Sequence, residues 1–85
     1  MTATTDIDTR VVHLIAQLVP VKEKDIKREQ RLRDDLGMDS VSSMELLSML
    51  AEDFELEVGV EDVADVHTVG DTIELVKVFL AKKAA

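Results

Sequence analysis

The chain has 85 residues, of which 46% are hydrophobic and 33% are charged, and its formal net charge at pH 7 is −8. This length supports one globular domain, residues 1–85, and leaves little room for the cleft and catalytic groups of an enzyme, so we expect a protein that is not itself an enzyme. The acidic charge argues against a nucleic-acid partner, and the absence of cysteine excludes disulfides, thiolate zinc sites and any thiol of the chain's own.

Residues 6–19 have the pattern of an amphipathic helix. Apolar residues at positions 7, 11, 14, 15 and 18 recur at helical spacing and are expected to face the core. We expect Asp6 or Asp8 near the start of this helix. Pro20 is expected to end it, because proline cannot continue a helix.

Residues 21–39 form a long, charged connection. Ile26, Leu32 and Leu36 recur there at roughly helical intervals and are expected to hold the connection against the core. Gly37 is the residue in this segment that reaches positive φ freely, so we expect a sharp turn shortly before Ser40. Because a connection of this length is unusual in a compact domain, it favours a functional role.

The second helix is expected over residues 40–54 or 40–55, with Asp39 as its N-cap. Its core-facing stripe consists of Leu46, Leu47, Leu50 and Phe54. The apolar arc is wider than an ordinary surface helix needs, because Val41 and Met44 extend it toward Ser40. These two residues fit either a helix packed on several sides or an exposed docking strip.

Two further residues of the second helix, Ser48 and Met49, also have expected positions. Ser48 lies beside Val41 on the helical projection. Met49 is expected to project from the polar side, between Glu45 and Asp53.

The last third of the chain predicts one short and one longer helix. Residues 61–66 suit one or two helical turns, and residues 68–71 have the pattern of a capped helix start. The stripe that follows consists of Ile73, Val76, Phe79 and Leu80. No strand-like alternation occurs, so the predicted fold class is all-α: a small antiparallel bundle of three main helices plus one short helix, with a long loop between the first two main helices.

Charge is strongly segregated along the chain. Residues 34–76 contain thirteen Asp and Glu residues and no Lys or Arg, whereas six of the ten basic residues lie within 22–33. Acidic residues keep small proteins soluble, but complete segregation over this length favours a negative face that attracts basic partners.

Ser40 stands where the second helix begins. A helix N-terminus exposes unpaired N–H groups and the positive end of the dipole, so a phosphate ester on Ser40 would be favourably placed. Position alone favours an ordinary capping role.

The residues around Ser40 resemble a known motif. The run from Leu36 to Val41, Leu-Gly-Met-Asp-Ser-Val, is similar to the Leu-Gly-x-Asp-Ser-Leu motif of acyl carrier proteins. The similarity extends over nearly the whole chain, through the first helix, the long loop, the acidic second helix and the Thr-Val-x-Asp start of the last helix.

The resemblance implies that Ser40 receives a 4′-phosphopantetheine group from coenzyme A through a phosphopantetheinyl transferase. The thiol of that arm would hold acyl chains as thioesters, which explains how a carrier functions without a cysteine. Asp39 would help to present Ser40, and Gly37 would supply the turn before it.

The resemblance also implies the partners. Glu45, Glu52 and Asp53 would meet basic patches on the transferase and on acyltransferases, ketosynthases or other acyl-processing enzymes, with fast and salt-sensitive association. Val41 and the serines that follow it depart from the fatty-acid pattern, and residues 57–61 lack the usual Ile-Pro. These departures leave fatty acid, polyketide and specialised lipid synthesis as alternatives.

The location expected from the sequence is the cytoplasm. Residues 1–6 show neither the basic flank nor the apolar run of a signal peptide, and no apolar stretch is long enough to span a membrane. We expect a monomer that does not insert into membranes.

Other functions fit less well. His13 and His67 stand at unrelated positions, so we expect no metal site, and the Gly-x-Ser-x-Gly elbow of serine hydrolases is missing. The remaining alternative is a small acidic adaptor that binds proteins and uses Ser40 only as a helix cap.

Overall fold

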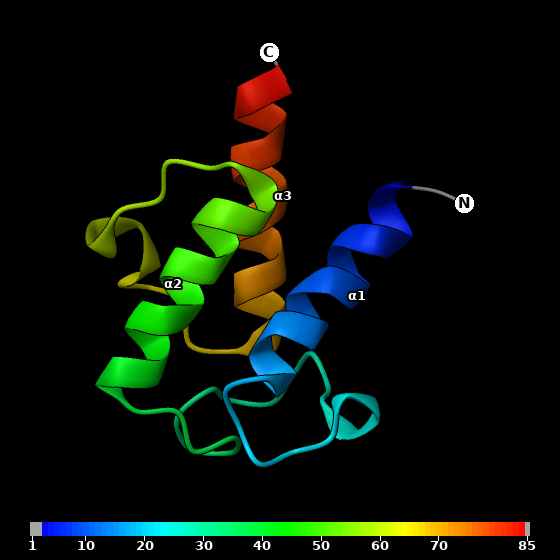
Figure 1. Ribbon diagram of the computed structural model, residues 1–85, viewed down its shortest axis with the longest axis vertical. Coiled ribbons are helices and arrows are strands. Elements are labelled where there is room, and N and C mark those ends of the chain that lie inside the picture. Colours follow the sequence, from blue (N-terminus) through cyan, green and yellow to red (C-terminus); the bar gives the residue numbers. More distant parts are fainter. Residues whose placement is uncertain (1–2, 85) are drawn as a thin grey trace.

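A computed structural model describes the backbone of residues 3–84 and the side chains of residues 7–83. Three α-helices dominate it, as expected from the sequence (Figure 1). They are α1 (Ala3–Ala16), α2 (Ser40–Phe54) and α3 (Val69–Ala84), and two single-turn 3₁₀ helices, η1 (Glu23–Asp25) and η2 (Val60–Val63), lie in the connections. The described part contains no strand, and no described helix is long and apolar enough to cross a membrane.

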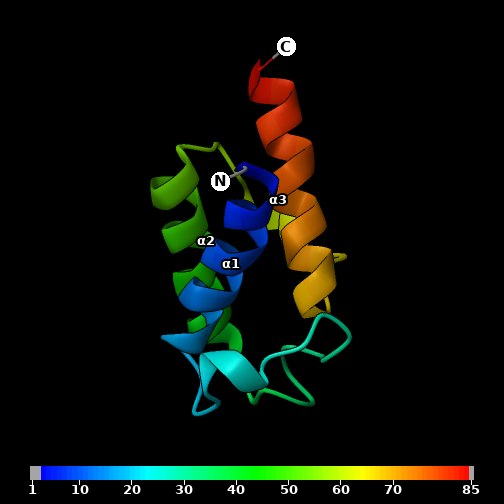
Figure 2. The same ribbon diagram turned by 90° about the vertical axis from the view of Figure 1, so that its right-hand side faces the viewer.

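The three helices pack around one core in a bundle with a long crossover. Helix α1 contacts both α2 and α3, and α2 contacts α3. Figures 1 and 2 show that α1 runs downward from the N-terminus, whereas α2 and α3 both run upward. Helix α1 is therefore antiparallel to the other two helices. The connection through η2 makes this possible, because it returns the chain along the bundle before α3 begins.

Helix α1 differs from its predicted bounds. It begins at Ala3 and its α-helical part ends at Ala16. Gln17 and Leu18 then donate their N–H groups to carbonyl groups three residues back, over 3.2 and 2.9 Å, so the last turn tightens and Pro20 follows the helix instead of ending it. Asp8 consequently lies in the second turn, and the side chain of Asp6 lies outside the described residues.

The core confirms most of the predicted apolar positions. The buried residues include the stripe of α2 and the three loop residues expected to hold the connection, namely Leu46, Leu47, Leu50, Phe54, Ile26, Leu32 and Leu36. Met38, whose burial was not predicted, also lies in the core. The long loop thus contributes its own side chains to the core, which fixes the segment that leads into α2.

Backbone hydrogen bonds join this loop to the start of α3. The N–H of Leu32 donates to the carbonyl of His67 over 2.9 Å, and the N–H of Gly70 donates to the carbonyl of Arg28 over 2.8 Å. A Cβ at Gly70 would lie 3.2 Å from that carbonyl oxygen, so glycine permits the close approach. The loop is therefore held by residues far along the chain.

Side chains reinforce this attachment. The Arg28 guanidinium lies 3.3 Å from Asp8 of α1 and 3.5 Å from Glu74 of α3, and Lys77 lies 3.5 Å from the other oxygen of Asp8. These partly exposed ion pairs are individually weak. Together they join the loop, α1 and α3 at one point.

Replacing a loop residue that is buried in the core should destabilise the whole domain. Leu36 is 2% exposed, so Leu36→Ala is expected to lower the free energy of unfolding by about 2–5 kcal/mol, measured by urea denaturation followed by circular dichroism. Val78 of α3 is 48% exposed and serves as control, because Val78→Ala should change stability by less than about 0.5 kcal/mol. Equal costs for the two variants would contradict the burial of the loop.

Candidate functional site

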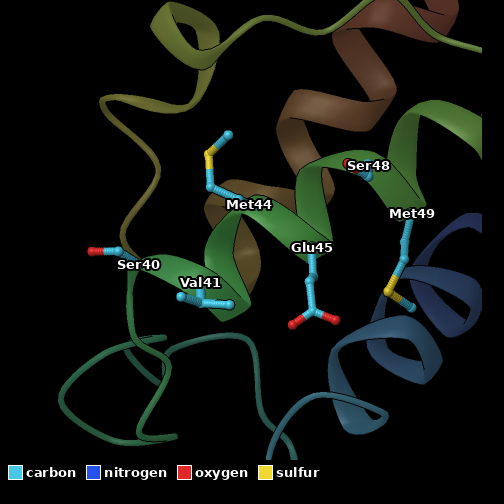
Figure 3. A pocket seen from close by; sticks show the side chains of 6 residues that line it. All are labelled: Ser40, Val41, Met44, Glu45, Ser48 and Met49. Carbon is cyan, nitrogen blue, oxygen red and sulfur yellow. The ribbon is translucent and has the colours of Figure 1, made fainter.

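Ser40 is the first residue of α2 and is exposed. Asp39 precedes it as the N-cap, and its carboxylate accepts the N–H of Ser42 over 2.8 Å. The Asp39 carbonyl accepts the first helical bond, from Ser43, over 2.9 Å. Figure 3 shows the Ser40 hydroxyl pointing away from the helix. The expected cap is confirmed, and because Asp39 provides it, the Ser40 hydroxyl has no hydrogen-bond partner among the described residues.

The turn before Ser40 depends on Gly37. Its φ is +75°, a conformation that costs side-chain-bearing residues free energy, and a Cβ there would meet nothing within 4 Å. Backbone conformation, and not lack of space, is therefore what favours glycine. Leu36 and Met38 on either side are buried, so the turn is anchored at both ends.

The electrostatics of the helix start favour negative charge. Hydrogen bonds from the backbone and then the side chain of Ser42 hold the pKa of Asp39 below its usual value of 3.8. The N–H of Ser40 has no acceptor among the described residues. A phosphate ester on the Ser40 hydroxyl would lie in the positive end of the α2 dipole, so the residues fit such a group.

An apolar cleft adjoins Ser40 along the exposed side of α2. We call it the docking cleft. Its volume is about 550 Å³, and it is lined by Ser40, Val41, Met44, Glu45, Ser48 and Met49 (Figure 3). Val41 is 68% exposed and Met44 50% exposed, so these two residues do not belong to the core.

The expected position of Met49 on the polar side was wrong. Its side chain is half-buried and packs against the core, and Figure 3 shows it pointing toward α1. Helix α1 packs against α2 on this side, and the periodicity of α2 alone does not reveal where α1 lies.

The acidic residues of α2 have different surroundings. Glu45 and Glu52 are exposed and form no ion pair with any described side chain. Asp53 instead accepts two hydrogen bonds from the Arg10 guanidinium, of 2.6 and 3.0 Å, and Arg10 also lies over the ring of Phe54 at 4.3 Å. The charge of Asp53 is therefore partly neutralised by another residue of the protein. Arg10 and Asp53 are 43 positions apart in the sequence, so a local sequence pattern could not predict this pair.

The two histidines lie apart. The His13 ring is 2.9 Å from Glu23, while His67 lies in the segment before α3. Among the described residues, no group of three His, Cys, Asp or Glu side chains is placed to hold a metal ion.

Comparison with known proteins connects this geometry to a family. Residues 9–76 match the profile of the family described as "Phosphopantetheine attachment site". The structure is similar to a Mycobacterium tuberculosis protein assigned as an acyl carrier protein, with 28% identity, a TM-score of 0.78 and coverage of 85% of this chain and 96% of that one.

Two further structures are similar. The acyl carrier protein of Enterococcus faecalis has 25% identity and a TM-score of 0.76, with coverage of 93% of this chain and 99% of that one. The apo doublet acyl carrier protein from prodigiosin biosynthesis has 26% identity and a TM-score of 0.74, with coverage of 91% of this chain and 38% of that one.

The Asp39 cap should make stability depend on pH. Because the folded-state pKa is lowered, the stabilisation is fully present above the unfolded-state pKa and is lost as pH falls through the folded-state pKa. Asp39→Asn keeps a capping oxygen but does not ionise, so its free energy of unfolding should fall less steeply than that of the wild type below pH about 4. Glu57→Gln, at an exposed acid outside the helices, is the control. Superimposable acid unfolding curves for wild type and Asp39→Asn would contradict this role.

Proposed function

The chain belongs to the phosphopantetheine attachment site family and, within it, to the acyl carrier proteins, and from this premise we propose that Ser40 is the serine that carries 4′-phosphopantetheine. The observation that carries the proposal is the placement of Ser40: an exposed hydroxyl at the first position of α2, directly after a separate N-cap. It lies inside the matched range, residues 9–76.

Each residue of the helix start has a distinct task in this proposal. When bound, the prosthetic group supplies the thiol that the chain lacks, and on it acyl groups are held as thioesters. Gly37 turns the chain, Asp39 caps the helix, and Ser40 serves as a tether and not as a catalyst. The positive end of α2 accommodates the phosphodiester.

The docking cleft and the free acids of α2 are the surface for partners in this proposal. Val41 and Met44 would contact apolar groups, while Glu45 and Glu52 would attract basic patches on the phosphopantetheinyl transferase and on acyltransferases, ketosynthases or related enzymes. Ser48 lines the same cleft. Asp53 contributes less than these two glutamates, because Arg10 already occupies its carboxylate.

We assign the carrier to the synthesis of fatty acids, polyketides or specialised lipids, acting as a cytoplasmic monomer. The second candidate is an acidic adaptor for which Ser40 is only part of a helix start. An adaptor would also use the acidic surface of α2, but this hypothesis gives no role to the Ser40 hydroxyl, which does not take part in the Asp39 cap.

The covalent role of Ser40 is tested by intact mass. After incubation with coenzyme A and a broad-specificity phosphopantetheinyl transferase, the wild type should gain one phosphopantetheinyl unit, and Ser40→Ala should gain none. Ser42→Ala and Ser43→Ala are matched controls within the same turn and should still gain the unit. An unmodified wild type would support the adaptor, and a modified Ser40→Ala would assign the attachment to another residue.

The partner surface is tested by charge reversal. Replacing both Glu45 and Glu52 by lysine should slow transferase modification on the order of tenfold at low salt, and by less at high salt, without loss of helical circular dichroism. Glu57 and Asp65 are exposed acids outside α2, and their replacement by lysine makes the same charge change. If the Glu45/Glu52 double variant and the Glu57/Asp65 double variant slow transferase modification equally, the acidic residues act through net charge alone and not through a defined surface.

A further inference from the structure

Methionine is the main oxidisable residue of the chain before a prosthetic arm is attached. The sequence contains four methionines and no cysteine, tryptophan or tyrosine. A hydroperoxide therefore meets thioether sulfurs and no thiol in the apo protein. Met38, Met44 and Met49 belong to the part of the chain whose side chains the structure describes, and Met1 lies outside it.

The three described methionines differ strongly in exposure. Met38 is 3% exposed and belongs to the core, and Met49 is half-buried and packs against the core. Met44 is 50% exposed, and Figure 3 shows its side chain extending away from α2. An oxidant must reach the sulfur to react with it, so the expected order of reactivity is Met44, then Met49, then Met38.

Met44 lies one helical turn from Ser40. Residues four apart share one side of a helix, with Cβ atoms roughly 5–6 Å apart. Both residues line the docking cleft, together with Val41. Val41 is more exposed, at 68%, but it contains no sulfur. A protein that approaches the Ser40 hydroxyl through the docking cleft therefore meets Met44, and Met44 is the residue there that an oxidant changes most readily.

Oxidation of Met44 changes the character of the docking cleft. The sulfur lone pair attacks one oxygen of a hydroperoxide, an S–O bond forms as the O–O bond breaks, and the proton leaves with the other oxygen as water or an alcohol. The sulfur loses two electrons and the hydroperoxide gains them. The sulfoxide is polar and chiral, whereas the thioether is apolar and adaptable. An apolar partner surface that covers the sulfoxide removes water from its oxygen without replacing the hydrogen bonds, which costs free energy.

We propose that Met44 is a reversible oxidation site that regulates the docking cleft: the thioether accepts the apolar surface of an acyl-processing partner, and the sulfoxide weakens that contact. Dithiol-dependent methionine sulfoxide reductases regenerate the thioether, with release of water and oxidation of the dithiol to a disulfide. The inference rests on the proposed function, because it requires the docking cleft to be the partner surface. Oxidising conditions then slow the carrier without unfolding it, because Met38 is protected in the core.

Peptide mass spectrometry tests the reactivity. The apo wild type is treated with increasing concentrations of hydrogen peroxide and then digested with a protease that cleaves after acidic residues. Asp39 and Glu45 separate Met38, Met44 and Met49 into different peptides. Met44 should be oxidised several-fold faster than Met49, and Met38 should be the slowest of the three. Equal rates at Met44 and Met38, or loss of helical circular dichroism as Met44 is oxidised, would overturn the proposal.

Transferase kinetics test the consequence. Phosphopantetheinyl transfer from coenzyme A is followed by intact mass before and after treatment of the apo protein, with the peroxide removed first. The wild-type rate should fall on the order of tenfold and recover after treatment with methionine sulfoxide reductases specific for the two sulfoxide epimers. Met44→Leu should keep its own untreated rate, whereas Met49→Leu, which retains Met44, should slow as the wild type does. Each variant is compared with itself, so the effect of the substitution on the untreated rate does not enter.

The outcomes separate this inference from the proposed function. An untreated wild type that gains no phosphopantetheinyl unit would overturn the proposed function and, with it, this inference. Normal modification of the untreated protein, together with an unchanged rate once Met44 is oxidised, would overturn this inference alone. Equal slowing of Met44→Leu and the wild type by peroxide would also overturn it, because another residue would then be responsible.

Discussion

The burial of the loop between α1 and α2 is the constraint on which the rest of the structure depends. Leu36 and Met38 are both buried, at 2% and 3% exposure, on either side of a glycine with positive φ. This fixes where the chain emerges from the core and forces Asp39 into the N-cap position. Ser40 is then the first residue beyond the cap, where its hydroxyl faces solvent and its backbone belongs to the positive end of α2. A carrier needs such a placement, because its tether must be rigidly positioned and yet accessible.

The acidic residues of α2 are only partly neutralised by basic residues of the bundle. Near the C-terminal end of α2, Arg10 binds Asp53, and Lys83 donates to the carbonyl of Glu55 over 3.0 Å. Basic residues of the same chain therefore compensate both the charge of Asp53 and the negative end of the helix dipole. Glu45 and Glu52 have no such described partners. The negative charge of α2 that remains for association is therefore that of Glu45 and of Glu52, and not that of Asp53. Weak, screened attraction of this kind suits a carrier that must bind and leave several enzymes in turn.

Much of this arrangement could be predicted from local sequence patterns. The bounds of α2, its Asp39 cap, the loop residues that reach the core and the start of α3 all follow from apolar periodicity and capping chemistry, which act over a few residues. The end of α1 was predicted too late, because the tightened last turn is set by packing and not by Pro20. The Arg10–Asp53 pair and the bonds between the loop and α3 join residues distant in sequence, so no local pattern reveals them.

The most direct test of the central claim is peptide mass spectrometry of the protein isolated from the cells that produce it. The account predicts that a phosphopantetheinyl group, with or without an acyl load, is localised by fragmentation to Ser40. Localisation to Ser42 or Ser43, or a protein that carries no such group in its native source, would contradict it.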